Sequence, residues 1–193
     1  PTSKMNNNKT VFFATGVLLI ILGAFMLIPF LVQFIYNENS STFLSSSAIT
    51  IFIGILLLLT NLEENKKLNL QQAFLLTTLS WLSIAIFGCL PFVLSNLELS
   101  LVDSFFESMS GITTTGSTII TNLDNSPKSI LIWRSILQWL GGIGIIVMAI
   151  TILPLLNIGG MQLFRMESSD TAEKILPRTR EVTLLISVIY LFL

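Results

Sequence analysis

Four long apolar runs constrain this chain most strongly, because each is long enough to cross a lipid bilayer as one helix. Such a helix needs about 20 consecutive, mostly apolar residues. No charged side chain lies within residues 11–36, 43–62 or 73–97, and Arg134 is the only charged residue within 129–156. Charged residues make up 11% of the chain, whereas a soluble domain carries about 25%. The sequence therefore predicts an all-α, multi-pass membrane protein.

A fifth apolar run begins at Val182 and continues to Leu193. A run of this length is too short to cross a bilayer, so we expect the chain to be the N-terminal fragment of a longer protein. The first run is too long for a cleaved signal sequence, and no small-residue cleavage site follows it.

The basic residues orient the spans, because cytoplasmic loops are enriched in Lys and Arg. Eight of the ten Lys and Arg lie before the first span, after the second or after the fourth. Only Lys128 and Arg134 lie on or near the opposite side. The N-terminus is therefore predicted to be cytoplasmic, with residues 98–128 outside.

Residues 98–128 lie between two spans and do not themselves cross the membrane. Within them, LVDSFFESMS (101–110) has helical apolar spacing, with Leu101, Phe105 and Met109 on one stripe. Ten helical residues rise about 15 Å, roughly half of the hydrocarbon thickness. The polar stretch GITTTGST follows at 111–118. A half-length helix and a polar strand between two spans predict a re-entrant pore loop.

The threonine-rich stretch suits a cation path. Non-helical backbone at membrane depth is tolerated only where it lines water or is buried in protein. An extended strand offers its carbonyls, and its Thr hydroxyls, to a dehydrated cation. Gly116 allows backbone angles that other residues avoid, and the negative end of the half helix favours a cation nearby. The alternative is a plain extracellular turn.

Asp103 and Glu107 lie one helical turn apart near the predicted outer mouth. Two carboxylates there would raise the local cation concentration, or they would simply partner the dipole of the helix N-terminus. A membrane enzyme that uses this pair as acid and base is a further alternative. The chain has no His, and its one Cys, Cys89, is interpreted as a buried apolar residue. We therefore predict no enzymatic activity.

Three segments resemble a known transporter family. They are SFFESMSGITTTGST (104–118), SPKSILIWRSILQWLGGIGIIVMAITILPLLNIGGMQLFRMES (126–168) and KILPRTRE (174–181). They look like the Trk-type potassium uptake transmembrane subunit of the Trk/Ktr/HKT cation transporter superfamily. The resemblance begins at about residue 70 and continues to the end, and GGMQLFR (159–165) is its most specific part.

The resemblance implies a fold in which four non-identical helix–pore-loop–helix repeats of one chain surround a central selectivity filter. This chain would supply the first repeat, after a two-helix N-terminal hairpin that is more similar to the Trk branch than to the Ktr branch. The expected repeat consists of an outer helix at 73–97, a pore helix at 101–110, a filter at 112–117 and an inner helix at 129–156. The predicted domains are residues 1–69 (hairpin), 70–156 (repeat), 157–181 (cytoplasmic linker) and 182–193 (start of a second repeat).

The resemblance also implies the ion-binding residues. Thr113, Thr114, Thr115 and Gly116 would form this chain's part of a potassium filter, with Thr114 and Thr115 as K⁺ ligands. Plant members with Ser at the position of Gly116 transport sodium, so Gly favours potassium. The other filters would lie beyond Leu193, and one strand cannot surround an ion. The predicted function, potassium uptake, therefore needs a longer chain or four assembled copies, with a sodium transporter or a non-conducting scaffold as alternatives.

The expected partners follow from the same resemblance. K⁺ is the transported ion, and no covalently bound cofactor is expected. A cytoplasmic nucleotide-binding regulatory subunit would contact residues 157–181, for which a solvated loop is the alternative. We also expect a homodimer of full-length chains, lipid contact in the bacterial inner membrane, and no nucleic-acid partner, since the net charge is −1.

Gly141, Gly142 and Gly144 lie within the fourth span. Small residues let membrane helices approach closely. Packing is therefore the favoured interpretation, with flexing of the inner helix as the alternative.

Pro29, Pro91 and Pro154 are predicted to kink or end their spans, because proline cannot donate the helical hydrogen bond. Arg134 is expected to reach the outer interface beside Trp133, as long basic side chains do. A pore-side charge that tunes ion flow is the alternative.

Overall fold

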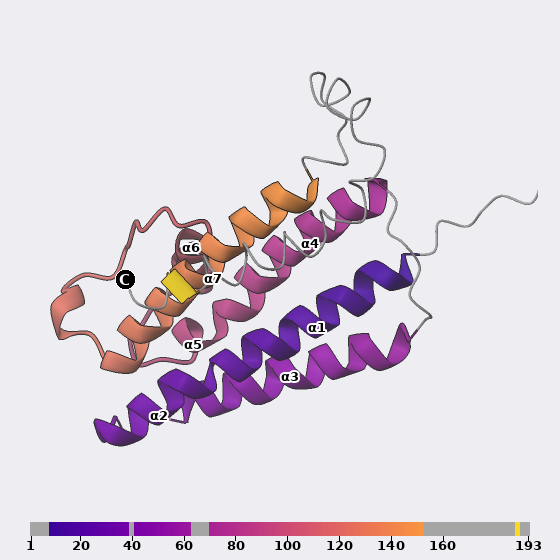
Figure 1. Ribbon diagram of the computed structural model, residues 1–193. Coiled ribbons are helices and arrows are strands. Elements are labelled where there is room, and N and C mark those ends of the chain that lie inside the picture. The colour runs from indigo at the N-terminus through magenta and orange to yellow at the C-terminus, as the bar shows by residue number, and fades with distance from the viewer. Residues whose placement is uncertain (1–7, 39–40, 63–69, 153–187, 190–193) are drawn as a thin grey trace, which may run out of the picture. The chain divides into compact units, whose positions relative to one another are not determined.

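The structure is a computed structural model that describes residues 8–38, 41–62, 70–152 and 188–189. The chain divides into two compact units, residues 1–138 and 139–193. Every regular element of more than two residues in the described ranges is a helix (Figure 1). The elements are α1 (Lys9–Phe25), α2 (Leu27–Ile35), α3 (Thr42–Thr60), α4 (Leu70–Gly88), α5 (Leu90–Val93), α6 (Leu101–Ile112), η1 (Leu123–Asn125) and α7 (Lys128–Ile152).

The four predicted spans are confirmed as helices long and apolar enough to cross a membrane. These helices cover Lys9–Ile35, Thr42–Thr60, Gln71–Val93 and Lys128–Ile146. The all-α membrane fold is therefore confirmed. The predicted domain boundaries stay predictions, and residues 157–181 lie outside the described residues.

Close packing of α1 against α3 builds the N-terminal hairpin, in which the two helices lie side by side (Figure 1). A Cβ atom added at Gly54 would lie 2.9 Å from the backbone oxygen of Gly16, and one at Gly16 would lie 2.8 Å from the oxygen of Gly54. Ser47 Oγ donates a 2.8 Å hydrogen bond to the oxygen of Gly23 across the same contact. Small residues therefore let these backbones approach, as in other membrane helix pairs.

The predicted breaks at two prolines are confirmed. The first span is interrupted at Met26, three residues before Pro29, and the third at Cys89, two residues before Pro91. Each proline lacks the amide that would donate to the preceding turn, so the helical ladder is interrupted there. Pro154 lies outside the described residues.

Trp133 fixes the start of α7 within the first unit. Its side chain is fully buried, and Nε1 donates a 2.9 Å hydrogen bond to the backbone oxygen of Gly88 at the end of α4. Its ring meets Phe43 of α3 edge to face, with ring centroids 6.2 Å apart. Aromatic pairs favour this arrangement. The tryptophan therefore ties α7 to both α3 and α4.

Candidate functional site: the loop between α6 and α7

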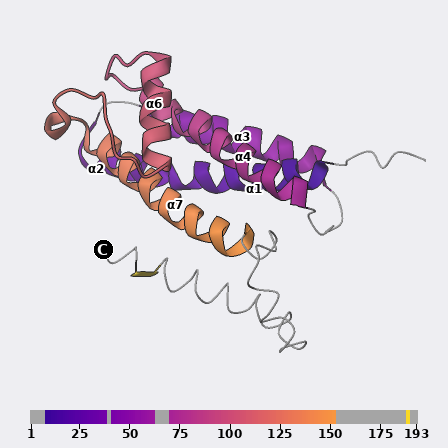
Figure 2. The same cartoon turned by 90° about the horizontal axis from the view of Figure 1, so that it is seen from above.

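Helix α6 confirms the predicted half-length helix and extends it to Ile112. It runs across the direction of α1, α3 and α4 (Figure 2). The helix begins with a reciprocal capping box: Ser100 Oγ accepts from the Asp103 amide at 3.1 Å, and Asp103 Oδ2 accepts from the Ser100 amide at 3.3 Å. Such a box satisfies two donors that a helix start leaves open. Asp103 therefore has a definite role in starting the helix.

The buried face of α6 is small and polar. Ser104, Glu107, Ser108 and Gly111 recur at helical spacing and are buried. The apolar stripe that revealed the helix is less buried: Leu101 is 70% exposed, and Phe105 and Met109 are half-buried. The apolar residues beside it, Val102 and Phe106, are 74% and 44% exposed. In a membrane protein an apolar face need not be the packed face, because lipid is itself apolar. The helix therefore packs through its polar side.

The C-terminus of α6 holds the amides of the predicted filter. The Thr113 amide donates to Met109 at 2.9 Å and the Thr114 amide to Gly111 at 2.9 Å. The oxygen of Ser110 accepts from the next two amides, those of Thr115 at 3.0 Å and Gly116 at 3.3 Å. The last carbonyls of a helix have no intrahelical partner. Here they bind four successive amides and fix the direction of the loop.

The carbonyls of the same residues are arranged differently. Within the described part of the chain, the backbone oxygens of Thr113, Thr114, Thr115 and Gly116 accept no hydrogen bond, and all four residues are exposed. Thr114 and Gly116 have positive φ angles, 57° and 77°. The sequence predicted an unusual backbone conformation only at Gly116. Thr114 was not expected to have one, because a positive φ is uncommon for a β-branched residue. The backbone amides of the loop are thus hydrogen-bonded, whereas its backbone carbonyls are free to accept a ligand.

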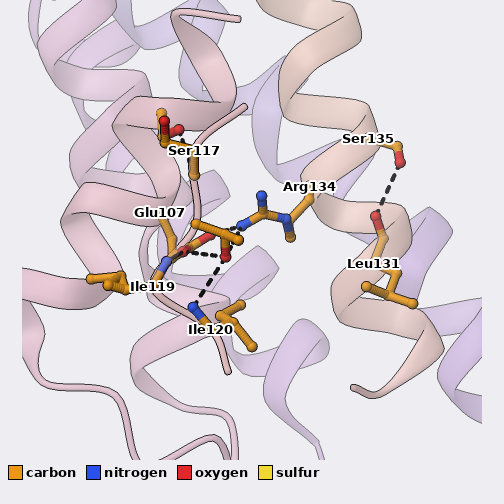
Figure 3. A network of polar contacts seen from close by, with 9 residues as sticks. Glu107, Ser117, Ile119, Ile120, Leu131, Arg134 and Ser135 are labelled. Atoms are coloured by element: carbon orange, nitrogen blue, oxygen red, sulfur yellow. Dashed lines mark hydrogen bonds and ion pairs between the residues drawn. The ribbon is translucent and has the colours of Figure 1, made fainter. Parts of the chain in front are cut away.

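Glu107 and Arg134 form a buried ion pair behind this loop (Figure 3). The side chain of Glu107 is fully buried and that of Arg134 is 10% exposed. Glu107 Oε1 accepts from the Ile119 amide at 2.6 Å and from Thr118 Oγ1 at 2.7 Å. Arg134 Nη1 also donates to Thr118 Oγ1, at 3.2 Å. The pair therefore connects α6, the loop and α7.

This geometry bears on the predicted site residues. The interface role expected for Arg134 is wrong, because its guanidinium is buried against Glu107 instead of reaching outward. A pore-mouth role for Asp103 and Glu107 stays a prediction, but Glu107 has its charge paired and its Oε1 already bonded. A charged residue inside an apolar span usually has a partner. That signal in the sequence predicts an acidic partner for Arg134, although it does not say which one.

Sequence reasoning also missed Ser110 and Thr118. Ser110 Oγ donates a 2.6 Å hydrogen bond to the oxygen of Ser117, just past the predicted filter. No rule based on residue spacing predicts that a serine side chain will form a hydrogen bond to the backbone of a loop seven residues later. Gly141 and Gly142 are buried and Gly144 is half-buried in α7, and their packing role stays a prediction.

The fold and this loop define the class of multi-pass α-helical membrane proteins with a short helix and an extended loop between two spans. Residues 39–193 match the TrkH family, whose members are described as cation transport proteins. The chain belongs to the TrkH cation transport protein family.

Individual relatives agree with this assignment. The chain is similar to the Trk system potassium uptake protein TrkH of Escherichia coli K12, with 40% identity over 92% of this chain and 38% of that protein. It is similar to TrkI of Halomonas elongata, another Trk system potassium uptake protein, with 56% identity over 56% of this chain and 22% of that protein. The crystal structure of the potassium transporter TrkH from Vibrio parahaemolyticus matches with a TM-score of 0.80 and 36% identity, over 95% of this chain and 36% of that one. The chain thus spans about two fifths or less of the length of these proteins.

Proposed function

We propose that the chain supplies the first pore-loop repeat of a potassium uptake protein, and that Thr113–Gly116 line its ion path. The observation that carries this proposal is the set of four consecutive carbonyls that accept no hydrogen bond in the described part of the chain, while their amides are bound by α6. Rings of such carbonyls replace the water of a dehydrated cation. The names of the relatives, potassium uptake proteins, support potassium as the ion.

Transport is favoured over the enzyme alternative by the state of the two carboxylates. Asp103 is engaged in the capping box and Glu107 in the ion pair, so neither is presented as a free acid or base. In the proposed function the protein binds K⁺ as its transported ion and needs no covalent cofactor. The non-conducting scaffold is the second alternative, and ion flux separates it from transport.

Topology and partners complete the proposal. The distribution of Lys and Arg supports a cytoplasmic N-terminus in a bacterial inner membrane. The resemblance supports a dimer of full-length chains and a nucleotide-binding regulatory subunit on the cytoplasmic face.

The test is ion flux in vesicles that contain the full-length protein to which this chain corresponds. Uptake of rubidium, as a potassium substitute, and of sodium is measured for the wild type, Gly116→Ser and Thr115→Val. Gly116 has φ 77° and a Cβ there would lie 3.7 Å from Gln138 Nε2, so strain and not crowding is the main effect of the serine. The rubidium-to-sodium ratio should fall in Gly116→Ser.

Thr115→Val serves as the matched control, because it keeps the backbone carbonyl and the side-chain shape. Its ratio should change less than that of Gly116→Ser, since carbonyls are proposed to hold the ion. An unchanged ratio in Gly116→Ser would remove this loop from the ion path. A wild type without rubidium uptake would favour the scaffold.

A further inference from the structure

The buried ion pair between Glu107 and Arg134 needs an explanation beyond stability. Taking two charges out of water is costly, and apolar residues of similar size often stabilise a protein as well as a buried ion pair does. Both side chains are almost fully buried. Buried ionic groups are best attested where they fix one arrangement among several. The other hydrogen bonds of Glu107 and Arg134 show which part of the chain the pair holds in place.

Thr118 is the shared partner, and its hydroxyl group is fully used. A threonine hydroxyl has one donor and two acceptor positions. Its proton goes to Glu107 Oε1 at 2.7 Å, and its oxygen accepts from Arg134 Nη1 at 3.2 Å and from the Ile120 amide at 3.1 Å. Glu107 also accepts from the Ile119 amide, so it holds this strand through one amide and one hydroxyl, whereas Arg134 holds it through that hydroxyl alone (Figure 3).

The pair holds the chain immediately after the predicted filter. Thr118 lies two residues beyond Gly116, at the exit of the predicted filter. The entry is held separately, by the oxygens of Met109 and Gly111, which accept from the amides of Thr113 and Thr114. The loop is therefore fixed at both ends, and only one end depends on a charged pair. The spacing of the four carbonyls between the ends depends on both attachments.

We propose that Glu107 and Arg134 are positioning residues for ion selectivity, acting through Thr118 and Ile119 on the strand that carries the filter carbonyls. This inference rests on the proposed function. Neither charge needs to contact the ion. Selectivity between similar cations depends on how well a fixed or stiff set of oxygens matches each ion. Loosening the exit of the strand then admits sodium more readily.

The test uses the full-length protein in vesicles and measures the rubidium-to-sodium uptake ratio at equal protein content. The variants are Glu107→Gln, which keeps the size but leaves Arg134 without its charge partner, and Thr118→Val, which keeps both charges but removes the shared hydroxyl. We expect the ratio to fall about tenfold in Glu107→Gln, the size that a lost hydrogen bond to a charged group supports. A smaller fall is expected in Thr118→Val.

The matched control is Glu98→Gln, the same carboxylate-to-amide change at an exposed position before α6 that has no hydrogen bond in the described structure. Its ratio should equal that of the wild type. Thr118→Val keeps the proposal testable if Glu107→Gln does not accumulate in the membrane, since it leaves the ion pair in place.

The outcomes separate the two proposals. A wild type that prefers rubidium, with reduced ratios in Glu107→Gln and Thr118→Val, supports the positioning role. A wild type that prefers rubidium, with variants that lose protein or total flux at an unchanged ratio, overturns it and leaves the proposed function intact. A wild type without rubidium flux overturns the proposed function itself, and this inference with it.

Discussion

The carboxylate of Glu38, in the connection after α2, caps the N-terminus of α7 across 90 residues of sequence. Its Oε1 accepts from the Lys128 amide at 2.6 Å and from the Ser129 amide at 3.4 Å, and its Oε2 accepts from Ser129 Oγ. The first amides of a helix have no partner within it, and a negative charge there is favoured by the helix dipole. The N-terminal hairpin thereby contributes the cap of the predicted inner helix.

Removing this cap should destabilise the protein. Glu38→Ala takes away the acceptor for two amides and a hydroxyl, and hydrogen bonds to a charged group contribute about 2 kcal/mol. The expected result is a lower midpoint of thermal unfolding in detergent. Glu98→Ala is the control, because that carboxylate is exposed and has no hydrogen bond in the described structure. Equal midpoints for the two variants would contradict the capping role.

Trp133 gives a second stability prediction. Trp133→Phe keeps an aromatic ring but removes the Nε1 donor to Gly88, whose carbonyl then loses a buried partner. An unsatisfied buried polar group costs about 1–3 kcal/mol. The same substitution at Trp81, which is only half-buried, is the control. Thermal unfolding should show a clear loss for Trp133→Phe and a smaller one for Trp81→Phe.

The sequence alone was sufficient to predict the helices and the positions at which two of them are interrupted. Spans follow from apolar length, and the interruptions before Pro29 and Pro91 follow from a missing amide. The same pattern could not say which face of α6 packs, because lipid accepts an apolar face as readily as protein does. The short helix and the turn after it were predictable as elements, but the orientation of α6 was not.

The contacts that hold the candidate site were not predictable for a second reason. Glu107 and Arg134 lie on different helices, and Glu38 and Ser129 are 91 residues apart. Periodicity and capping rules describe neighbours within one helix, so they are silent about such pairs. What the sequence did offer was one unexplained charge, Arg134, inside an apolar run.

Close packing of the N-terminal hairpin gives a third prediction. In Gly54→Leu the new side chain would begin 2.8 Å from Ile20 Cγ1 and 2.9 Å from the Gly16 oxygen. Overpacking of this kind costs about 1–3 kcal/mol, so α1 and α3 should separate and the unfolding midpoint should fall. Ala48→Leu adds the same side chain at an exposed position of α3 and should change little. Similar midpoints for both variants would show that the contact is not tight.

The last prediction concerns topology, which the charge distribution alone supports at present. Eight of the ten Lys and Arg lie in segments assigned to the cytoplasm, and such a bias sets the orientation of membrane proteins. Single cysteines are introduced at Asp124, in η1, and at Ser169, in a Cys89→Ala background. A membrane-impermeant maleimide added to intact cells should label the cysteine at Asp124. The cysteine at Ser169 should react only after permeabilisation, because α7 separates the two positions by one crossing of the bilayer.

Cys89→Ala without an added cysteine is the control for background labelling. The opposite pattern, with Ser169 reactive in intact cells and Asp124 protected, would place residues 98–128 in the cytoplasm. The loop between α6 and α7 would then open to the inside, and uptake of an external cation could not begin there.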